Sequence, residues 1–264
     1  RVYLSTGNYT ESIKYSDLVI NSGRYELVTG QSFVDYQRVE PETNKENIFV
    51  IKFTLKDDLG YGSLGSQWNG DGGYGEVYVS TTHMKLLNKY PEDLRQKQVA
   101  VQFTADKKDT LRRNGFPKIF MYKYSYQGGK ASMSSPAQFR LAEMYLNRAE
   151  CNAKLGNASE AIADINKIRT RANLTGTALY STTDLKGHAS VLDVVLEERK
   201  LELAFEGYRH YDLLRNNKTM IRDYAGVHPK DPGTKNTQTI LPSHPRNIHF
   251  LPEKELLLNP NLIN

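Results

Sequence analysis

The stretch from Leu196 to Arg215, LEERKLELAFEGYRHYDLLR, limits what this chain can fold into more than any other part of the sequence. Leu201, Phe205 and Tyr208 recur at helical spacing and form one apolar stripe, which is typical of a helix that lies against a core. Many other positions are charged, and acids and bases three residues apart can pair along a helix surface. The sequence therefore predicts one continuous amphipathic helix here. The predicted pairs are Arg199 with Glu202, Glu206 with Arg209, and Asp212 with Arg215.

A short motif occurs twice, as GNYTESI from Gly7 to Ile13 and as GNASEAI from Gly156 to Ile162. In each copy the glycine is typical of a helix end, the asparagine of a helix cap, and the glutamate can bond back to that cap. We expect the helix before the second copy to run from Pro136 to Leu155, because proline suits a first helical turn. The first copy has only Arg1–Thr6 before it, so we expect the natural protein to continue upstream. The two copies predict helical hairpins that loosely resemble tetratricopeptide repeats.

The sequence changes character between the two copies, roughly from Gly30 to Ser135. Short runs rich in β-branched and aromatic residues, bounded by turn residues, are typical of strands. The glycine-rich run from Gly60 to Gly75 is expected to hold no regular structure. We therefore expect a loop-rich insert with short strands. The candidate strands are Ile48–Leu55, Val77–Ser80, Val99–Thr104 and Lys118–Tyr126.

Composition argues against several functional classes. The net charge of +5 is mild and the basic residues are scattered, which disfavours a nucleic-acid-binding surface. No apolar run approaches the length needed to cross a membrane. The single cysteine, Cys151, excludes an internal disulfide and is expected to be a packed thiol. No motif calls for a cofactor, and we expect none.

Glu198, Glu202 and Glu206 lie four residues apart on one predicted helix face. Such carboxylates could hold a metal ion or form an acid–base pair. Each has an arginine nearby in the sequence, so we favour a structural ion-pair network. His244 and His249 are separated by proline and arginine and are expected to lie in an ordinary loop. The sequence also lacks the G-x-S-x-G nucleophile motif, and we expect neither a metal site nor a catalytic residue.

The segment YGSLGSQWNGDGGYGEVY, from Tyr61 to Tyr78, holds the only tryptophan. A sugar ring has an apolar C–H face and a rim of hydroxyls, so it is recognised by a flat aromatic side chain with amide or carboxylate groups beside it. A glycine-rich loop can carry both to the surface. The alternative is that Trp68 folds back and caps the core. The candidate glycan-binding residues are Trp68, Tyr74, Tyr61, Asn69 and Asp71.

The motif ERKLELAFEGYRHYDLLR resembles the C-terminal helix signature of the SusD/RagB family, which is close to E-R-x-x-E-L-x-x-E-G-x-R-x-x-D-L-x-R. Asn21–Leu27 resembles the family's N-S-G-x-Y-x-L, Arg140–Glu150 its R-x-A-E-x-x-L-x-x-A-E, and Ile248–Leu262 its closing N-P-x-L motif. The resemblance runs from one end of the chain to the other, without the family's N-terminal part. The signature residues are Glu198, Arg199, Glu202, Leu203, Glu206, Gly207, Arg209, Asp212, Leu213 and Arg215.

The resemblance implies a mostly α fold, with tetratricopeptide-like helical hairpins and a loop-rich insert that contains short β-strands. The whole chain would be the C-terminal part of one domain. Residues 1–29 and 136–225 would form the helical scaffold, 30–135 the ligand-binding insert, and 226–264 the C-terminal loop and tail. In the family the glycan site is an aromatic platform built partly from the region after the strand that Ile48–Leu55 matches, which favours Trp68 as a stacking residue.

The same resemblance implies a cell-surface lipoprotein of the outer membrane that is not an enzyme. It would capture a polysaccharide or oligosaccharide and deliver it to a SusC-like TonB-dependent transporter. Membrane association would depend on a lipid anchor in the missing N-terminal part.

Three alternatives make different structural predictions. A RagB-like peptide binder would have a deep groove in place of an exposed aromatic platform. A tetratricopeptide-type adaptor would bind a protein segment on its concave helical face and would not need Trp68. A glycosidase would present two carboxylates roughly 5–10 Å apart in one cleft.

Overall fold

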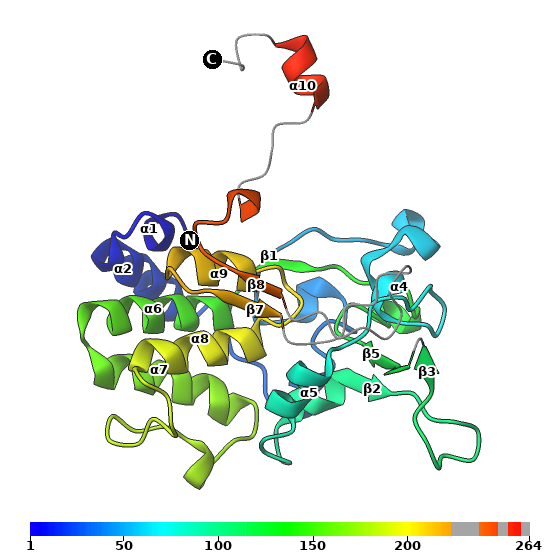
Figure 1. Cartoon of the computed structure of the whole chain (residues 1–264), viewed down its shortest axis with the longest axis horizontal. Helices are drawn as coiled ribbons and strands as arrows, with labels where there is room; N and C mark the ends of the chain where they lie inside the picture. The colour runs from blue at the N-terminus through cyan, green and yellow to red at the C-terminus, as the bar shows by residue number, and fades with distance from the viewer. Residues whose placement is uncertain (114, 223–237, 248–252, 260–264) are drawn as a thin grey trace.

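The computed structural model describes residues 1–113, 115–222, 238–247 and 253–259. Two regions lie side by side in Figure 1. The helical region, residues 1–29 and 136–222, lies on the left, and the insert, residues 30–135, extends to the right. The helices of the first region are α1 Val2–Ser5, α2 Tyr9–Ile20, α6 Leu141–Leu155, α7 Ala158–Arg171, α8 Val191–Glu202 and α9 Arg209–Arg215.

Antiparallel helical hairpins build the helical region, as the repeated motif predicts. Helix α6 packs against α2, α7 and α8, so it is the central helix. Its buried face carries Ala142, Leu146 and Ala149, which are inaccessible to solvent. These residues join a core cluster completed by Ile162, Ile165, Ile168, Tyr180, Val194, Val195 and Leu203. The expected mostly helical fold with tetratricopeptide-like hairpins is confirmed.

The two copies of the motif cap their helices differently. Asn8 accepts a hydrogen bond from the Glu11 backbone N–H at 3.3 Å, which caps α2 as expected. Gly156 ends α6 with a φ of +83°, the left-handed conformation that glycine adopts freely. Asn157 precedes α7 but makes no side-chain cap, and its amide instead bonds the Asn152 side chain at 3.2 Å. The cap predicted for the second copy is therefore wrong.

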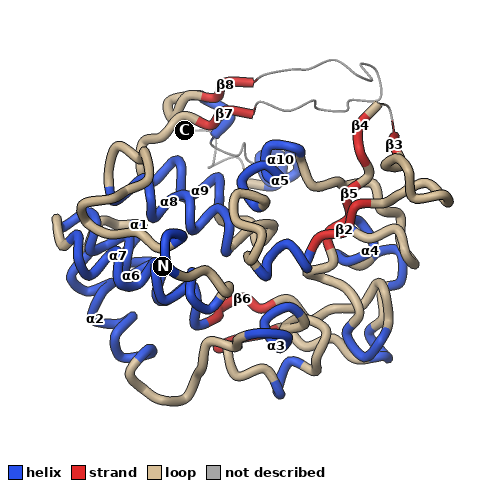
Figure 2. The backbone as a smooth tube through the Cα atoms, turned by 90° about the horizontal axis from the view of Figure 1, so that it is seen from below, coloured by secondary structure: helices blue, strands red, loops and turns tan. Residues whose placement is uncertain are grey.

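Short elements make up the insert and the end of the chain, and Figure 2 shows long loops between them. The strands pair two by two, all antiparallel: β1 with β6, β2 with β5, β3 with β4 and β7 with β8. The helices are α3 Gly30–Val34, α4 Leu64–Trp68, α5 Thr81–Leu87 and α10 Glu253–Leu258. The strands are β1 Asn47–Val50, β2 Val99–Val101, β3 Arg112–Arg113, β4 Phe116–Pro117, β5 Ile119–Met121, β6 Ala137–Arg140, β7 Met220–Arg222 and β8 Gln238–Ile240. The 3₁₀ turns are Pro41–Thr43, Leu55–Asp57, Gly60–Gly62, Leu94–Gln98, Gln127–Gly129, Gly176–Ala178 and Pro245–Asn247.

The continuous helix predicted over 196–215 is wrong. Helix α8 ends at Glu202 and α9 begins at Arg209. Between them Phe205 and Gly207 have φ of +66° and +84°, which no α-helix accommodates. Side chains from other elements bind the freed carbonyls of this break, so the helix ends without leaving them unpaired.

The helix predicted from Pro136 begins later. Residues Ala137–Arg140 pair with β1 as strand β6, and α6 starts at Leu141, whose backbone N–H bonds the Glu46 carbonyl at 2.9 Å. The β1 pairing competes successfully with a first helical turn for these backbone groups.

The predicted strands are shorter in the structure. The strand expected at Val77–Ser80 is absent among the described strands, although the Val79 N–H bonds the Ile119 carbonyl at 2.9 Å. The glycine-rich run does hold regular structure, a 3₁₀ turn at Gly60–Gly62 and then α4.

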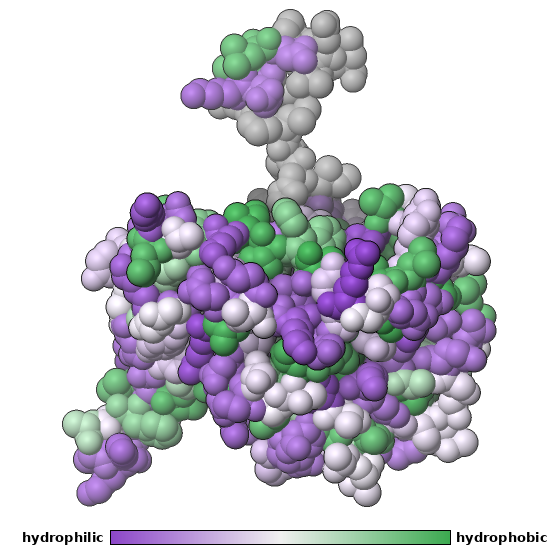
Figure 3. All heavy atoms as spheres, turned by 180° about the vertical axis from the view of Figure 1, so that it is seen from behind, coloured by the Kyte–Doolittle hydropathy of each residue, from purple (hydrophilic) through white to green (hydrophobic). Residues whose placement is uncertain are grey.

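The described helices include none that is both long and apolar enough to cross a membrane. Figure 3 shows hydrophilic and hydrophobic side chains interspersed over the face turned away from the viewer of Figure 1.

Candidate functional site

Ionised side chains fill the boundary between the insert and the helices. Arg140 binds the carboxylates of Glu46 and Glu202 at 2.8 and 2.6 Å, and that of Glu206 at 2.8 Å. Arg171 bonds Glu46 and Glu202 as well, while Arg95 bonds Glu198 at 2.7 Å. We call this set the boundary network. Its members, all almost fully buried, are Glu46, Asp93, Arg95, Lys123, Arg140, Arg169, Arg171, Glu198, Glu202 and Glu206.

The three glutamates serve ion pairing as expected, but in the interior and with cations from other elements. Of the three pairs predicted along the helix, Asp212 with Arg215 is confirmed at 2.7 Å. The predicted pairs of Arg199 with Glu202 and of Glu206 with Arg209 are wrong, because Arg199 pairs with Asp212 and the two glutamates pair with Arg140.

Burial alone would raise the pKa of Glu202, yet Arg171, Arg140 and Arg95 outweigh it and hold that pKa at about 2. The carboxylate is therefore ionised at neutral pH. Such a group is costly to bury unpaired, so the network fixes which elements meet at the boundary.

The insert also supplies the caps of the helix break. Lys123 donates to the carbonyls of Glu202 and Ala204 at 3.2 and 3.1 Å, and also to the Glu206 carboxylate. The Tyr124 hydroxyl donates to the Phe205 carbonyl at 3.0 Å. These bonds explain why the chain turns away from helical geometry here, because the insert satisfies the exposed carbonyl groups.

The break directs Phe205 into the insert. Its ring lies 4.7 Å from the Trp68 ring in an edge-to-face arrangement, and 5.5 Å from the ring of His83. Trp68 packs against a small buried cluster that contains Val79, Ile119 and Met121. Burial lowers the pKa of His83 to about 4, so its ring is neutral at pH 7. Trp68 therefore packs against a core while staying partly exposed, and its predicted role in sugar stacking stays a prediction.

Asn69, another candidate, is buried. Its side-chain oxygen accepts the Asp71 backbone N–H at 2.8 Å, and its amide donates to the Ala131 carbonyl at 3.3 Å. Nearby, a Cβ on Gly70 would come within 2.5 Å of the Phe120 ring. The glycines thus let the loop pack closely on β5, and Asn69 holds its start.

Tyr61 and Tyr74 lie on the surface. Their side chains are 60% and 58% exposed, and their ring centroids are 5.0 Å apart at an interplanar angle of 42°. Tyr61 stands on the 3₁₀ turn before α4, and Tyr74 is positioned by its backbone N–H, which bonds the Ser66 hydroxyl at 3.2 Å. The structure brings together these two rings, the tyrosine pair, on an exposed face of the insert.

Asp71 is exposed, and one of its two carboxylate oxygens is already hydrogen-bonded. Its Oδ2 accepts hydrogen bonds from the hydroxyls of Tyr122 and Tyr126, both at 2.9 Å. Burial and Asp71 together raise the pKa of Tyr122 to about 12. The Arg38 guanidinium lies 5.4 Å from the Tyr126 ring centroid. Sequence reasoning missed these two tyrosines, although their positions four apart in the aromatic run KIFMYKYSY were a signal.

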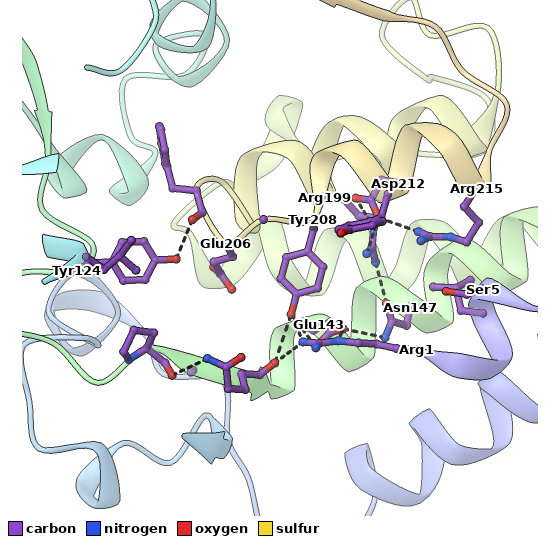
Figure 4. A pocket seen from close by; sticks show the side chains of 18 residues that line it. Arg1, Ser5, Tyr124, Glu143, Asn147, Arg199, Glu206, Tyr208, Asp212 and Arg215 are labelled. Atoms are coloured by element: carbon purple, nitrogen blue, oxygen red, sulfur yellow. Dashed lines mark hydrogen bonds and ion pairs between the residues drawn. The ribbon is translucent and has the colours of Figure 1, made fainter. Parts of the chain in front are cut away.

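A cavity of about 550 Å³ lies beside the helix break, between α1, α6 and α9 (Figure 4). Figure 4 shows the Tyr208 hydroxyl directed at Glu143, which Arg1 also contacts at 2.8 Å. Arg199, also in the lining, binds Asp212 and donates to the Asn147 side chain, both at 2.9 Å. The lining therefore combines paired charges with aromatic rings, including that of Phe205.

The remaining signature residues are structural too. Arg215 binds Glu150 and Asp212 at 2.8 and 2.7 Å, and Arg209 donates to the Leu196 carbonyl at 2.9 Å, which ties α9 back to α8. Cys151 is a buried free thiol, as expected.

The described residues contain no group of three or more His, Cys, Asp or Glu arranged to hold a metal ion. His244 lies in the described loop 241–247, whereas His249 lies outside the described residues, so the predicted loop is only half tested.

Known proteins resemble the chain over nearly its whole length. SusD-like protein P2 of Formosa agariphila is 25% identical over 292 aligned positions, which cover 99% of this chain and 56% of that protein. A SusD superfamily structure from Bacteroides vulgatus ATCC 8482 matches with a TM-score of 0.79 and 25% identity, over 98% of this chain and 55% of that one. The structure of a protein from the same strain that is named for sugar binding matches with a TM-score of 0.79 and 27% identity. The match covers 99% of this chain and 56% of that one.

The chain thus spans about half the length of these relatives. Residues 22–260 match the model of the SusD family. This match includes both the boundary network and the helix break. Because the family model covers most of the chain, the chain belongs to the SusD family.

Proposed function

We propose that this protein captures a polysaccharide or oligosaccharide at the cell surface through the tyrosine pair. The observation that carries the proposal is that the Tyr61 and Tyr74 rings stand exposed side by side on the insert. Rings 5.0 Å apart offer a surface on which the C–H face of a sugar can stack. Family membership and the relative named for sugar binding support the same ligand class.

Asp71, three residues before Tyr74 in the sequence, offers a hydrogen-bond acceptor for sugar hydroxyls. Asp71 uses Oδ2 for its two tyrosine partners, and Oδ1 is available as an acceptor. Trp68 and Asn69 support this surface from within, because one packs on Phe205 and the other fixes the loop backbone. We expect substitution of either residue to weaken glycan binding, because the loop that carries the tyrosine pair would lose its position.

The intact protein would be a lipid-anchored protein of the outer membrane that hands its ligand to a SusC-like TonB-dependent transporter. The step is binding alone: the acidic groups of the boundary network are paired with arginine or lysine and are unsuited to acid–base work. No bond of the glycan is made or broken.

A native-gel retardation assay tests the ligand class. The gels contain starch, xylan, galactomannan, laminarin, polygalacturonate or alginate, and the samples are the wild type, Tyr61→Ala with Tyr74→Ala, and Trp68→Ala. Tyr15→Ala is the matched control, because Tyr15 is 47% exposed and stacks on Tyr3 with centroids 5.4 Å apart, on the helical region.

We expect at least one polysaccharide to retard the wild type and the Tyr15 variant, and to lose its effect on the double variant. Retardation that survives in the double variant would move the site elsewhere. No retardation of the wild type by any of the six would overturn glycan capture.

The 550 Å³ cavity favours a second candidate, peptide capture in a groove. Its paired acids and bases could exchange partners with peptide termini or charged side chains, and Tyr211, 60% exposed, stands in its lining. This candidate predicts that a random peptide pool binds the wild type, that Tyr211→Ala weakens the binding, and that the double tyrosine variant binds normally. If the Tyr211→Ala variant binds the peptide pool as tightly as the wild type does, the cavity is excluded as the peptide site.

A further inference from the structure

A smaller pocket, of about 190 Å³, lies beside Tyr61. Two of its lining residues, Leu59 and Ser63, flank the Gly60–Gly62 turn that carries this tyrosine. It shares Leu64 and Pro136 with the larger cavity, so the two hollows lie on either side of a common wall. The lining residues are Phe53, Asp57, Asp58, Leu59, Ser63, Leu64, Ser132, Met133, Ser134 and Pro136.

Hydrogen bonds hold the acidic part of this pocket in place. The Asp57 Oδ2 accepts the backbone N–H and the hydroxyl of Thr54 at 2.9 and 2.6 Å, which leaves Oδ1 for a ligand. Asp58 accepts the Gly60 N–H at 2.9 Å and pairs with Lys130. The bonds from Thr54 lower the pKa of Asp57, and Lys130 lowers that of Asp58, so both are ionised at neutral pH.

Most of the remaining lining of the pocket is apolar. Phe53, Leu59, Leu64, Met133 and Pro136 supply carbon surface, and Met133 is almost fully buried. A lining that combines carbon surface with carboxylate acceptors matches a pyranose ring, which has a C–H face and a rim of hydroxyl donors. The volume lies below the roughly 300–1,000 Å³ of sites for drug-sized ligands. It therefore suits one sugar ring and not a length of chain.

We propose that this pocket binds the terminal sugar unit of the captured glycan, and that it selects a neutral or amino sugar over an acidic one. Among the described residues that line it are two acids and no base. Lys130 neutralises Asp58 from outside the lining, so a uronic acid or sulfated unit would face the negative charge of Asp57. The inference rests on the proposed function, because it places the end of a chain whose neighbouring units stack on the tyrosine pair.

Titration calorimetry with defined sugars tests the inference. The probes are maltohexaose, cellohexaose, xylohexaose and mannohexaose, and, for the two glucose hexamers, the same compounds oxidised at C6 to carboxylates. The pocket variants are Asp57→Asn and Leu59→Ala. Each has a matched control outside the pocket. Asp106→Asn removes an exposed acid that also accepts a threonine hydroxyl, and Leu55→Ala removes a leucine that is 68% exposed.

We expect a neutral hexamer to bind the wild type, and Asp57→Asn and Leu59→Ala to weaken it roughly three- to tenfold, as the loss of one good contact does. The controls bind normally, and the C6-oxidised hexamer binds the wild type at least tenfold more weakly than its parent. In Asp57→Asn the affinities for the oxidised hexamer and for its parent should differ less than they do in the wild type.

Two results would overturn the pocket while leaving glycan capture intact. One is normal binding of the neutral hexamer by both pocket variants when the double tyrosine variant has lost it. The other is binding of the oxidised hexamer as tight as that of its parent. If no hexamer binds and no polysaccharide retards the protein, both proposals fail.

Discussion

The helical region and the insert are stabilised in different ways. The helices bury a core cluster of ten residues around α6. The buried apolar side chains of the insert are spread over several short elements, and the cluster of Val79, Ile119 and Met121 holds only some of them. The insert relies on the boundary network, on two-stranded pairings and on glycines that allow close backbone contact. A core divided among short elements leaves many side chains free to face solvent, which suits the ligand site that we propose for this region.

The largest effect should come from removing the central cation of the boundary network. Arg140→Met leaves Glu46, Glu202 and Glu206 without their shared partner, and breaking a buried ion pair costs about 3–5 kcal/mol. Urea unfolding measures the loss. In the control Lys14→Met, which removes an exposed pair with Glu11, stability should hardly change. Equal effects in the two variants would show that the boundary network does not join the regions.

Acid should unfold the protein through the same network. The folded pKa of Glu202 is about 2 and its ordinary value is 4.5, so its stabilisation is complete above pH 4.5 and is lost as the pH falls toward 2. This one group accounts for a loss on the order of 3 kcal/mol. Unfolding free energies between pH 6 and 3 check the sign, and a stability that rises on acidification would contradict it.

A smaller effect should follow from Phe205→Ala. The half-buried ring contacts both Trp68 and His83, and its loss should cost about 2 kcal/mol, below the usual range for a fully buried phenylalanine. Because Trp68 is the only tryptophan, its fluorescence emission reports this contact directly and should shift to longer wavelength. Phe139→Ala, at a more exposed ring, should leave the emission unchanged. An unchanged spectrum in Phe205→Ala would mean that the break does not support the insert.

The smallest effect concerns the helix break itself. Gly207 has a φ of +84° and open space around its Cα, so Gly207→Ala meets no clash and costs about 1 kcal/mol of backbone strain. Thermal unfolding measures it. A stabilised variant would indicate that 196–215 prefers the continuous helix.

The sequence predicted the helical region well because its signals are local. Apolar spacing and the GNYTESI and GNASEAI motifs describe hairpins whose partners are near in the chain. The helix break could not be predicted, since the bonds that stabilise it come from Lys123 and Tyr124, about eighty residues away. The family signature, which resembles one helix, therefore encodes the two helices α8 and α9 and the charged side chains that pair them with other elements.

The candidate site was only partly predictable for the same reason. The pattern identified the segment that carries the exposed tyrosine pair, but which of its side chains are exposed depends on packing partners. Trp68 packs against Phe205, and the buried Asn69 bonds the Ala131 carbonyl. Tyr61 and Tyr74 remain exposed. The terminal-sugar pocket combines residues 53–64 with 132–136, a pairing that no short motif contains.

Hydrogen–deuterium exchange with and without a retained glycan tests most directly whether the insert, and not the helical region, carries the ligand. We expect slower exchange at residues 57–78 and 132–136, with exchange in α2 and α7 unchanged. Protection confined to α2, α6 or the walls of the 550 Å³ cavity, with 57–78 unaffected, would contradict it.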